Sequence, residues 1–378
     1  MRILFSSTRG AGHLQPLLPY ARALLARKHE VAVAAPSVVS ETLRAEGLLH
    51  LPFDHPGDDV LAPIWARLRG WSDEALGIAA SEIFAGVSAQ AALPKLQAAM
   101  QSFRPDLVLR DSVEYGALVA AEHANVRHAR IAVHSVSFEE VLPRHVDEPL
   151  DVLRKLVGLA PDQGAALRDE AVFSSFPASL DAVISSRMRP PFRARVVEAP
   201  PSSAPAVWAP ADDPRPLIYI TFGTIAGSTA HIRAIYRTAL EAVAELPVRA
   251  LLTTGKGMDA DLLGAIPANV HVEAFIPQRD VLPHAAAVVC HGGSGTLLGA
   301  LAAGLPMVIV PFGADQPHNA QLVAQVGAGL ALSSPDASTL GATIQRLLDA
   351  PALRQKAQSL AAEIAAMPTI DGAIDTLL

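Results

Sequence analysis

Short runs of leucine and β-branched residues alternate with Ala-rich amphipathic segments in the first half of the chain. The predicted strands are the apolar runs 2–6, 30–35, 106–110 and 127–133, and the predicted helices are 14–28, 37–46 and 114–124. Strands that are apolar almost throughout are typical of a parallel sheet covered by helices on both faces. The pattern therefore predicts an α/β domain.

The pattern weakens between 135 and 200, where prolines accumulate, and restarts after a Pro-rich stretch. The second set of predicted strands is 217–222, 248–253, 270–274, 286–290 and 306–310, with helices at 230–246, 295–303 and 317–326. We expect two doubly wound parallel-sheet domains, 1–200 and 217–358, a linker at 201–216, and a C-terminal helix at 359–378 that could cross back to the first domain. Ligands of such sheets bind at the carboxyl ends of the strands, here in a cleft between the two domains.

Composition and charge limit the classes of protein to consider. Of the 378 residues 51% are hydrophobic and 18% charged, which excludes a mainly disordered chain. The 30 Lys and Arg against 37 Asp and Glu give a net charge of −7, which argues against a nucleic-acid partner or an anionic membrane surface. The uncharged stretch 297–314 is close to spanning length, but its glycines and prolines divide it into a short helix and a short strand. The lone Cys290 and the short apolar N-terminus favour a cytoplasmic protein without a membrane span.

A glycine-containing turn follows the first predicted strand. Gly10 and Gly12 begin a dinucleotide-type fingerprint, but Gln15 replaces its third glycine and Ala34-Ala35-Pro36 replaces its acidic residue, so NAD binding is not expected. The turn delivers His13 to the carboxyl edge of the sheet, where it is either a general base or a structural histidine.

Asp111 follows the predicted strand 106–110 and could orient His13 or cap the next helix. Glu114 is a nearby competitor that we expect to cap that helix or face solvent.

The second domain carries two further polar turns at carboxyl edges. His291-Gly292-Gly293-Ser294-Gly295-Thr296 leads into a helix, and such glycines let backbone N–H groups approach an anion. His291, protonated or donating a hydrogen bond, would add a contact to a pyrophosphate. After the next strand, Asp315 and Gln316 supply groups suited to sugar hydroxyls, although Asp315 also fits a helix N-cap.

Three blocks, Phe275-Ile276-Pro277-Gln278, His291 to Thr296 and Asp315-Gln316-Pro317-His318-Asn319-Ala320, occur in this order. Together they resemble the nucleotide-sugar signature of Leloir-type GT-B glycosyltransferases, with the closest likeness to the bacterial antibiotic and macrolide enzymes of family 1. The resemblance implies a GT-B fold and an inverting transfer of a sugar, including deoxysugars, from a nucleotide donor. It implies an apolar acceptor of polyketide, macrolide or enediyne type, and neither a cofactor nor a metal.

The resemblance also implies roles for individual residues. His13 would deprotonate the acceptor hydroxyl with Asp111 as its partner, and Phe275 would stack on the base, with the Ile276 backbone at the base edge. The implied phosphate contacts are Gly223, Thr224, His291, Gly293, Ser294, Gly295 and Thr296, and the implied sugar contacts are Asp315 and Gln316. Gly12, Trp65, His134 and Phe138 are candidate acceptor contacts within the segments 53–75 and 135–200, His134 also being interpretable as structural.

Gly299 departs from the pattern of plant members, which carry a ribose-binding Glu at this position. Its absence favours a dTDP-linked donor over a UDP-linked one. Asp259-Ala260-Asp261 matches a metal-binding Asp-x-Asp pattern, but we interpret it as the capped start of a solvent-facing helix. An epimerase, a cell-wall sugar transferase and a non-catalytic nucleotide-binding relative stay open as alternatives, as does the choice between monomer and homodimer.

Overall fold

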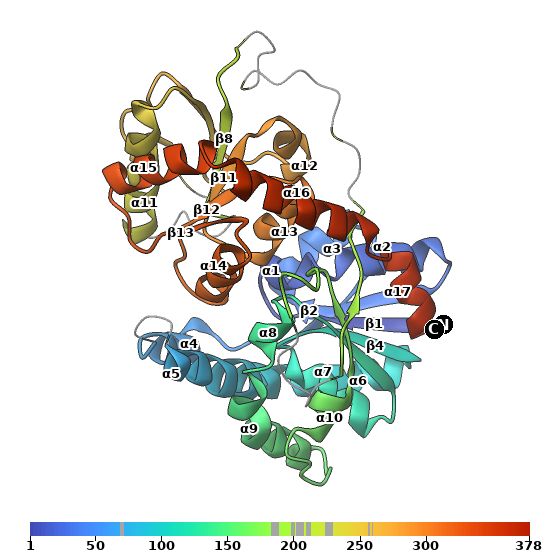
Figure 1. Cartoon of the computed structure of the whole chain (residues 1–378). Coiled ribbons are helices and arrows are strands. Elements are labelled where there is room, and N and C mark those ends of the chain that lie inside the picture. The colour runs from blue at the N-terminus through green and yellow to red at the C-terminus, as the bar shows by residue number, and fades with distance from the viewer. Residues whose placement is uncertain are drawn as a thin grey trace. The chain divides into compact units, whose positions relative to one another are not determined.

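The computed structural model describes the chain except for residues 69–71, 183–188, 198–200, 202–207, 209–212, 224–229, 256–257 and 259. The chain divides into two compact units (Figure 1). The first unit comprises Met1–Val196 and Pro368–Leu378, and the second comprises Val197–Met367. Each unit is built on one parallel sheet, which confirms the predicted pair of doubly wound α/β domains.

The first unit contains a seven-stranded sheet with the strand order β3-β2-β1-β4-β5-β6-β7. Its strands are β1 (Arg2–Ser6), β2 (Glu30–Pro36), β3 (Leu49–Phe53), β4 (Leu107–Asp111), β5 (Arg127–Ile131), β6 (Ala171–Ser174) and β7 (Phe192–Arg193). β1 and β4 are parallel neighbours in a register that pairs Ser6 with Arg110. The turns that follow these two strands therefore start side by side.

Helices cover both faces of this sheet (Figure 1). They are α1 (Ala11–Leu14), α2 (Leu18–Ala26), α3 (Ser40–Ala45), α4 (Asp58–Trp65), α5 (Asp73–Ile78), α6 (Ala89–Phe103), α7 (Tyr115–His123), α8 (Val136–Glu139), α9 (Pro143–Leu156), α10 (Ala165–Asp169) and α17 (Ile370–Leu377), with short turns η1 (Ser37–Val39) and the π-helical η2 (Ala79–Ser88). Leu4 of β1 belongs to the core under α6, α7 and α9, whereas its neighbours Ile3 and Phe5 belong to the core under α2, α3 and α17. This alternation explains why the strand is apolar at every position.

The structure differs from the sequence prediction mainly where prolines stand. The predicted helix 14–28 is two helices, because Pro16 has no N–H to continue α1. The segment expected to be irregular between 135 and 200 contains α8, α9, α10, β6 and β7. Pro143 occupies the first turn of α9, where a proline is tolerated, so the accumulation of prolines was a misleading signal there.

The helical stretch Asp73–Phe103 was not predicted. Among the described residues it is the one helix long and apolar enough to cross a membrane by length and composition, and 44% of its most apolar window is buried. Its buried residues, including Ala89, Ala92, Leu93 and Leu96, pack in the core beside α7. The apolar character of this stretch thus has a packing explanation within the first unit.

The second unit contains a six-stranded sheet with the order β10-β9-β8-β11-β12-β13. Its strands are β8 (Leu217–Thr221), β9 (Arg249–Thr253), β10 (Val270–Glu273), β11 (Ala287–Cys290), β12 (Met307–Ile309) and β13 (Gly329–Ala331). Its helices are α11 (Ala230–Ala244), α12 (Gln278–Val281), α13 (Ser294–Ala302), α14 (Gln316–Gln325), α15 (Ala337–Leu348) and α16 (Pro351–Ala366), with short turns η4 (Ala260–Leu263) and η5 (Leu282–His284). The uncharged stretch 297–314 forms the end of α13 and strand β12, as its glycines and prolines predicted.

The C-terminal segment is two helices where one was predicted over 359–378. α16 ends at Ala366 in the second unit, and Pro368 separates it from α17, which belongs to the first unit. Ile374 of α17 is fully buried in the core beside α2, and Arg27 forms ion pairs with Asp371 and Asp375. The chain therefore ends as part of the unit in which it begins.

Candidate active site

The carboxyl edges of β1 and β4 meet at Asp111, a fully buried carboxylate. Its Oδ2 accepts hydrogen bonds from the Thr8 backbone N–H at 2.7 Å, the Thr8 hydroxyl at 3.0 Å and the Ser7 hydroxyl at 3.3 Å. Its Oδ1 accepts from the backbone N–H groups of Val113 at 2.8 Å and Glu114 at 3.0 Å. Burial opposes the charge, but the neighbouring His13 and the N–H donors outweigh it and lower the pKa of Asp111 to about 2. Asp111 is therefore ionised and held in one orientation.

His13 lies on the short helix α1 beside this carboxylate. Its Nδ1 is 3.6 Å from Asp111 Oδ2, longer than a hydrogen bond, and 21% of its side chain is exposed. Catalytic hydrogen bonds are often loose in the absence of substrate. The structure thus brings together the two residues that the sequence placed at neighbouring strand ends.

Glu114 is the residue that caps α7, so the alternative interpretation of Asp111 as that cap is wrong. The Glu114 carboxylate accepts hydrogen bonds from the N–H groups of Gly116 at 3.1 Å and Ala117 at 2.9 Å, and from the Ser6 hydroxyl at 2.7 Å. It is buried rather than facing solvent, contrary to one of the two expectations. Burial, together with the charge of Asp111, raises the pKa of Glu114 to about 7.

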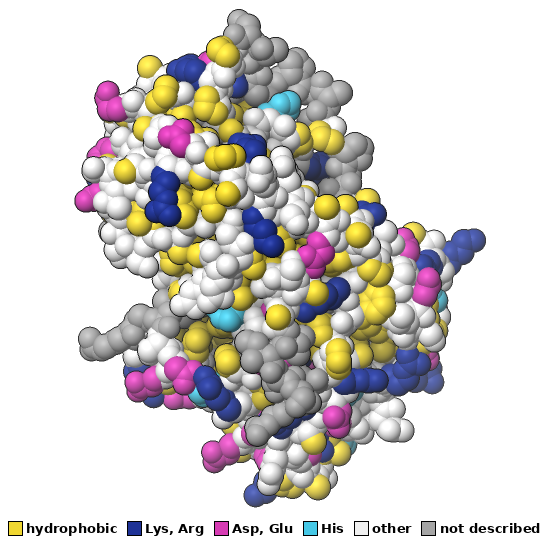
Figure 2. Space-filling view, viewed as in Figure 1, with side chains coloured by type: hydrophobic (Ala, Val, Ile, Leu, Met, Phe, Trp, Pro, Cys, Tyr) yellow, Lys and Arg dark blue, Asp and Glu magenta, His cyan; other side chains and the backbone are white. Residues whose placement is uncertain are grey.

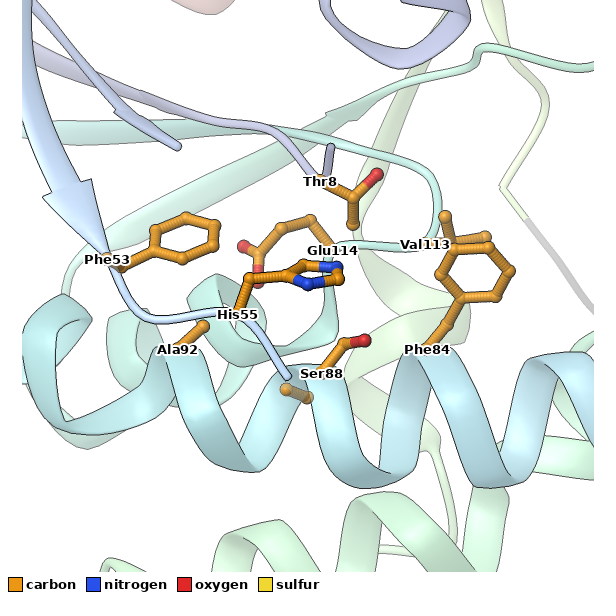
Figure 3. A pocket seen from close by; sticks show the side chains of 9 residues that line it. Thr8, Phe53, His55, Phe84, Ser88, Ala92, Val113 and Glu114 are labelled. Atoms are coloured by element: carbon orange, nitrogen blue, oxygen red, sulfur yellow. The ribbon is translucent and has the colours of Figure 1, made fainter. Parts of the chain in front are cut away.

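A small cavity of about 230 Å³ lies next to this cluster (Figure 3). It is lined by Thr8, Phe53, His55, Phe84, Ser88, Ala89, Ala92, Val113 and Glu114. Phe84, Ser88 and Ala92 rise from one side of the helical stretch that the sequence prediction missed (Figure 3). Their spacing of four residues was the signal that could have found them.

The candidate acceptor residues are distributed unevenly. The ring of His134 lies 6.0 Å from that of His13 in an edge-on orientation, and Phe138 lies 5.2 Å from His134. Trp65 lies on α4, 42% exposed, and does not line the cavity. Gly12 is exposed on α1, and a Cβ there would meet no atom within 4 Å. His134 and Phe138 are thus the two that the fold places with His13.

In the second unit, the ring of His291 lies in a narrow slot after β11. A Cβ added at Gly223, where φ is +89°, would be 3.1 Å from the ring, and one at Gly293 would be 2.5 Å from its Nε2. The ring of Phe312 stacks against it at 6.1 Å. Burial lowers the pKa of His291 to about 4 despite the charge of Asp315. The ring is therefore neutral at neutral pH, so the expectation of a protonated His291 is wrong and the hydrogen-bonding alternative is the one that fits.

The N-terminus of α13 opens beside this histidine. Gly293 is the N-cap and makes no side-chain capping bond, so the first N–H groups of the helix, from Ser294 onward, are directed toward an incoming anion. Gly295 is exposed and Thr296 is buried. This geometry suits a diphosphate, which a helix N-terminus attracts by its dipole.

Asp315 and Gln316 stabilise the two loops as well as lying at the strand edge. Asp315 Oδ2 accepts from the Ser294 hydroxyl at 2.9 Å and from the Asn319 amide at 2.8 Å. The Asn319 amide also donates to the Gly292 carbonyl at 2.9 Å. Gln316 Oε1 accepts from the N–H groups of Phe312 at 2.8 Å and Gly313 at 3.1 Å, which leaves its NH₂ group as the part that faces no such bond. Asn319 was quoted in the motif without a role, and its spacing of four from Asp315 was the available signal.

Phe275 and Ile276 follow the edge strand β10. Phe275 is 53% exposed, as a stacking surface must be, and Ile276 is half-buried. Gln278 Nε2 donates to the Thr296 hydroxyl at 3.2 Å, and a Cβ at position 299 would lie 2.6 Å from Gln278 Oε1. Gly299 therefore admits the Gln278 side chain to the face of α13.

Some predicted residues carry no structural statement, because Thr224 and Asp259 lie outside the described residues. Within the part of the chain that the structure describes, no group of three His, Cys, Asp or Glu side chains could hold a metal ion. On the face visible in Figure 2, charged side chains of both signs are scattered over each unit.

Comparisons with known proteins agree with this geometry. Residues 237–377 match the family described as erythromycin biosynthesis protein CIII-like, C-terminal domain. The chain is 33% identical over 384 residues to elloramycin glycosyltransferase ElmGT of Streptomyces olivaceus, covering 97% of this chain and 94% of that protein. The structure of the glycosyltransferase SnogD from Streptomyces nogalater is similar with a TM-score of 0.78 and 26% identity, over 100% of this chain and 98% of that one. The glycosyltransferase VinC, solved in complex with dTDP, shares the fold at 22% identity with a TM-score of 0.78, over 100% and 98% of the two chains.

The slot around His291 predicts opposite effects for two glycines of one loop. Gly293→Ala places a Cβ against the largely buried ring and should lower the free energy of unfolding by about 1–3 kcal/mol, as overpacking does. Gly295→Ala, whose Cβ meets no atom within 4 Å, should be neutral or stabilise by up to about 1 kcal/mol through helix propensity. Urea unfolding of the ligand-free variants measures both. Equal effects of the two substitutions would contradict the described slot.

Proposed function

The chain belongs to the GT-B glycosyltransferases of bacterial antibiotic and natural-product biosynthesis, and on this premise we propose that it transfers a sugar, with inversion, from a dTDP- or UDP-sugar to a hydroxyl of an apolar natural product. The observation that carries the mechanism is the buried, ionised Asp111 behind the half-buried ring of His13. A carboxylate in this position fixes the tautomer of the ring and stabilises the imidazolium that forms when His13 accepts a proton.

The donor half of the proposal rests on the second unit. The exposed Phe275 stacks on the nucleobase, the backbone of Ile276 meets the base edge, and the 293–296 turn holds the diphosphate. The N-terminus of α13 and the neutral His291 stabilise the charge that develops on the diphosphate, so the proposed mechanism uses no metal. Asp315 and the NH₂ group of Gln316 bind hydroxyls of the sugar.

The acceptor half rests on the first unit. The acceptor hydroxyl lies against Nε2 of His13, the ring nitrogen remote from Asp111, and apolar side chains such as Phe84 and Phe138 contact the rest of the molecule. The hydroxyl oxygen attacks the anomeric carbon as the bond to the diphosphate breaks. The hydroxyl proton passes to His13, and the nucleoside diphosphate leaves with the bonding electron pair. We place the reaction in the cytoplasm, where the buried thiol of Cys290 stays reduced.

Removal of the base should separate turnover from donor binding. His13→Ala should lower kcat by about 10²–10⁴, the usual contribution of a general base, while the Kd for dTDP stays unchanged. Product formation by chromatography and dTDP binding by calorimetry give the two quantities. His145→Ala is the matched control, because His145 also lies 3.6 Å from a carboxylate, that of Asp73, with 20% of its side chain exposed. Turnover near that of the wild type in His13→Ala would exclude His13 as the base.

The nucleotide preference follows from the ribose-facing position. With Gly299 and the Gln278 amide where other members carry a carboxylate, a 2′-hydroxyl gains no charged partner, so dTDP should bind more tightly than UDP. Thermal unfolding with dTDP, UDP, GDP or NAD tests this, since a ligand at 100 times its Kd stabilises the folded state by about 2.7 kcal/mol. A larger effect of UDP would refute the ribose argument and keep the transferase. No effect of either pyrimidine nucleotide would refute the donor site.

A further inference from the structure

A second histidine–carboxylate pair lies next to His13 and Asp111. The Nδ1 of His134 is 3.6 Å from Glu139 Oε1, the same separation as in the first pair. The backbone N–H of His134 donates to the same oxygen at 3.3 Å. Glu139 is fully buried, whereas 15% of the His134 side chain is exposed. The two pairs therefore share one construction, a buried carboxylate behind a partly exposed ring.

The Glu139 carboxylate is held as an ion by its surroundings. The Ser112 hydroxyl donates to Oε1, and Arg130 Nε lies 3.5 Å from Oε2. Burial alone would raise the pKa of Glu139, but the charge of Arg130 and the contacts from His134 and Ser112 outweigh it, so the pKa is lowered. Ser112 follows Asp111 directly in the chain, which ties the positions of the two carboxylates to one turn after β4.

The two histidine rings belong to one row of aromatic side chains. His13 and His134 lie 6.0 Å apart with their planes at 81°. Phe84 lies 6.0 Å from His13 on one side, and Phe138 lies 5.2 Å from His134 on the other. A flat apolar ring system that contacts the phenylalanines would therefore meet both imidazoles.

Resting on the proposed function, we propose that His134 recognises a second acceptor hydroxyl on the carbon next to the one that His13 deprotonates. A carboxylate only accepts hydrogen bonds, so Nδ1 of each histidine carries the proton and Nε2, on the far side of the ring, is an acceptor. Two adjacent ring hydroxyls lie within hydrogen-bonding distance of each other, so one pair can reach both rings. The chemical class selected is a ring with vicinal hydroxyls, and His134 determines specificity without accepting the proton.

Three naphthalene acceptors isolate the second hydroxyl. With dTDP-glucose as donor, 2,3-dihydroxynaphthalene offers both hydroxyls, 3-methoxy-2-naphthol replaces one proton donor by a methyl ether, and 2-naphthol lacks the second oxygen. The wild type should favour the first compound over the second by about 2- to 10-fold in kcat/KM, the effect of one net hydrogen bond. The comparison is counted per attackable hydroxyl, since the dihydroxy compound presents two.

Substitution of His134 should remove this preference selectively. His134→Phe keeps a ring but no acceptor, so it should bring the ratio close to one while kcat/KM for 3-methoxy-2-naphthol changes less than twofold. His134→Gln offers an amide oxygen and should restore part of the ratio. His145→Phe is the matched control and should keep the wild-type ratio, and dTDP binding measured on each variant reports correct folding of the donor unit.

The outcomes separate the two proposals. An unchanged ratio in His134→Phe would overturn the role of His134 alone. An equal loss of transfer to all three acceptors in His134→Phe would also overturn it, because His134 would then be the base or a structural residue. Absence of transfer to any of the three acceptors by the wild type, with dTDP bound, would count against the proposed function itself.

Discussion

The ionised carboxylate of Asp111 is the constraint on which the first unit's chemistry depends. An uncompensated charge in a protein interior costs several kcal/mol, and Asp111 has no exposed surface. Its hydrogen bonds come from the turn after β1 and from its own turn after β4. Those donors converge only because the two strands are parallel neighbours in a fixed register. The sheet therefore fixes the carboxylate, and the carboxylate in turn gives His13 its tautomer.

The second unit solves the opposite electrostatic problem. There the ligand brings the negative charge, and the protein supplies a helix N-terminus and a neutral histidine in place of fixed cations. Keeping His291 neutral requires burial, and burial requires that Gly223 and Gly293 leave room for the ring. The hydrogen bonds of Asp315 and Asn319 hold the two glycine-containing loops together. Local packing thus sets the charge state that the diphosphate meets.

Much of this arrangement could be predicted from the sequence, because it follows from strand ends. Near-continuous apolar runs located β1, β4 and β11, and parallel pairing then placed His13 near Asp111. The helical stretch Asp73–Phe103 was missed, and with it Phe84 and the cavity, because its apolar residues do not alternate with polar ones in a clear period. The capping role of Glu114 and the neutral state of His291 depend on burial, which the motifs do not encode. Glu139 was missed because its partners, Arg130 and Ser112, are distant in the sequence.

The stereochemistry of transfer tests the mechanism most directly, because a single base and one displacement require inversion at the anomeric carbon. In dTDP-α-D-glucose the bond that breaks is axial, so attack from the opposite face gives a β-glucoside. The product formed with 2,3-dihydroxynaphthalene can be assigned from the coupling between H1 and H2 in its proton NMR spectrum. The mechanism predicts the large coupling of a β-glucoside. The small coupling of an α-glucoside would contradict it, since retention needs a second displacement or front-side attack.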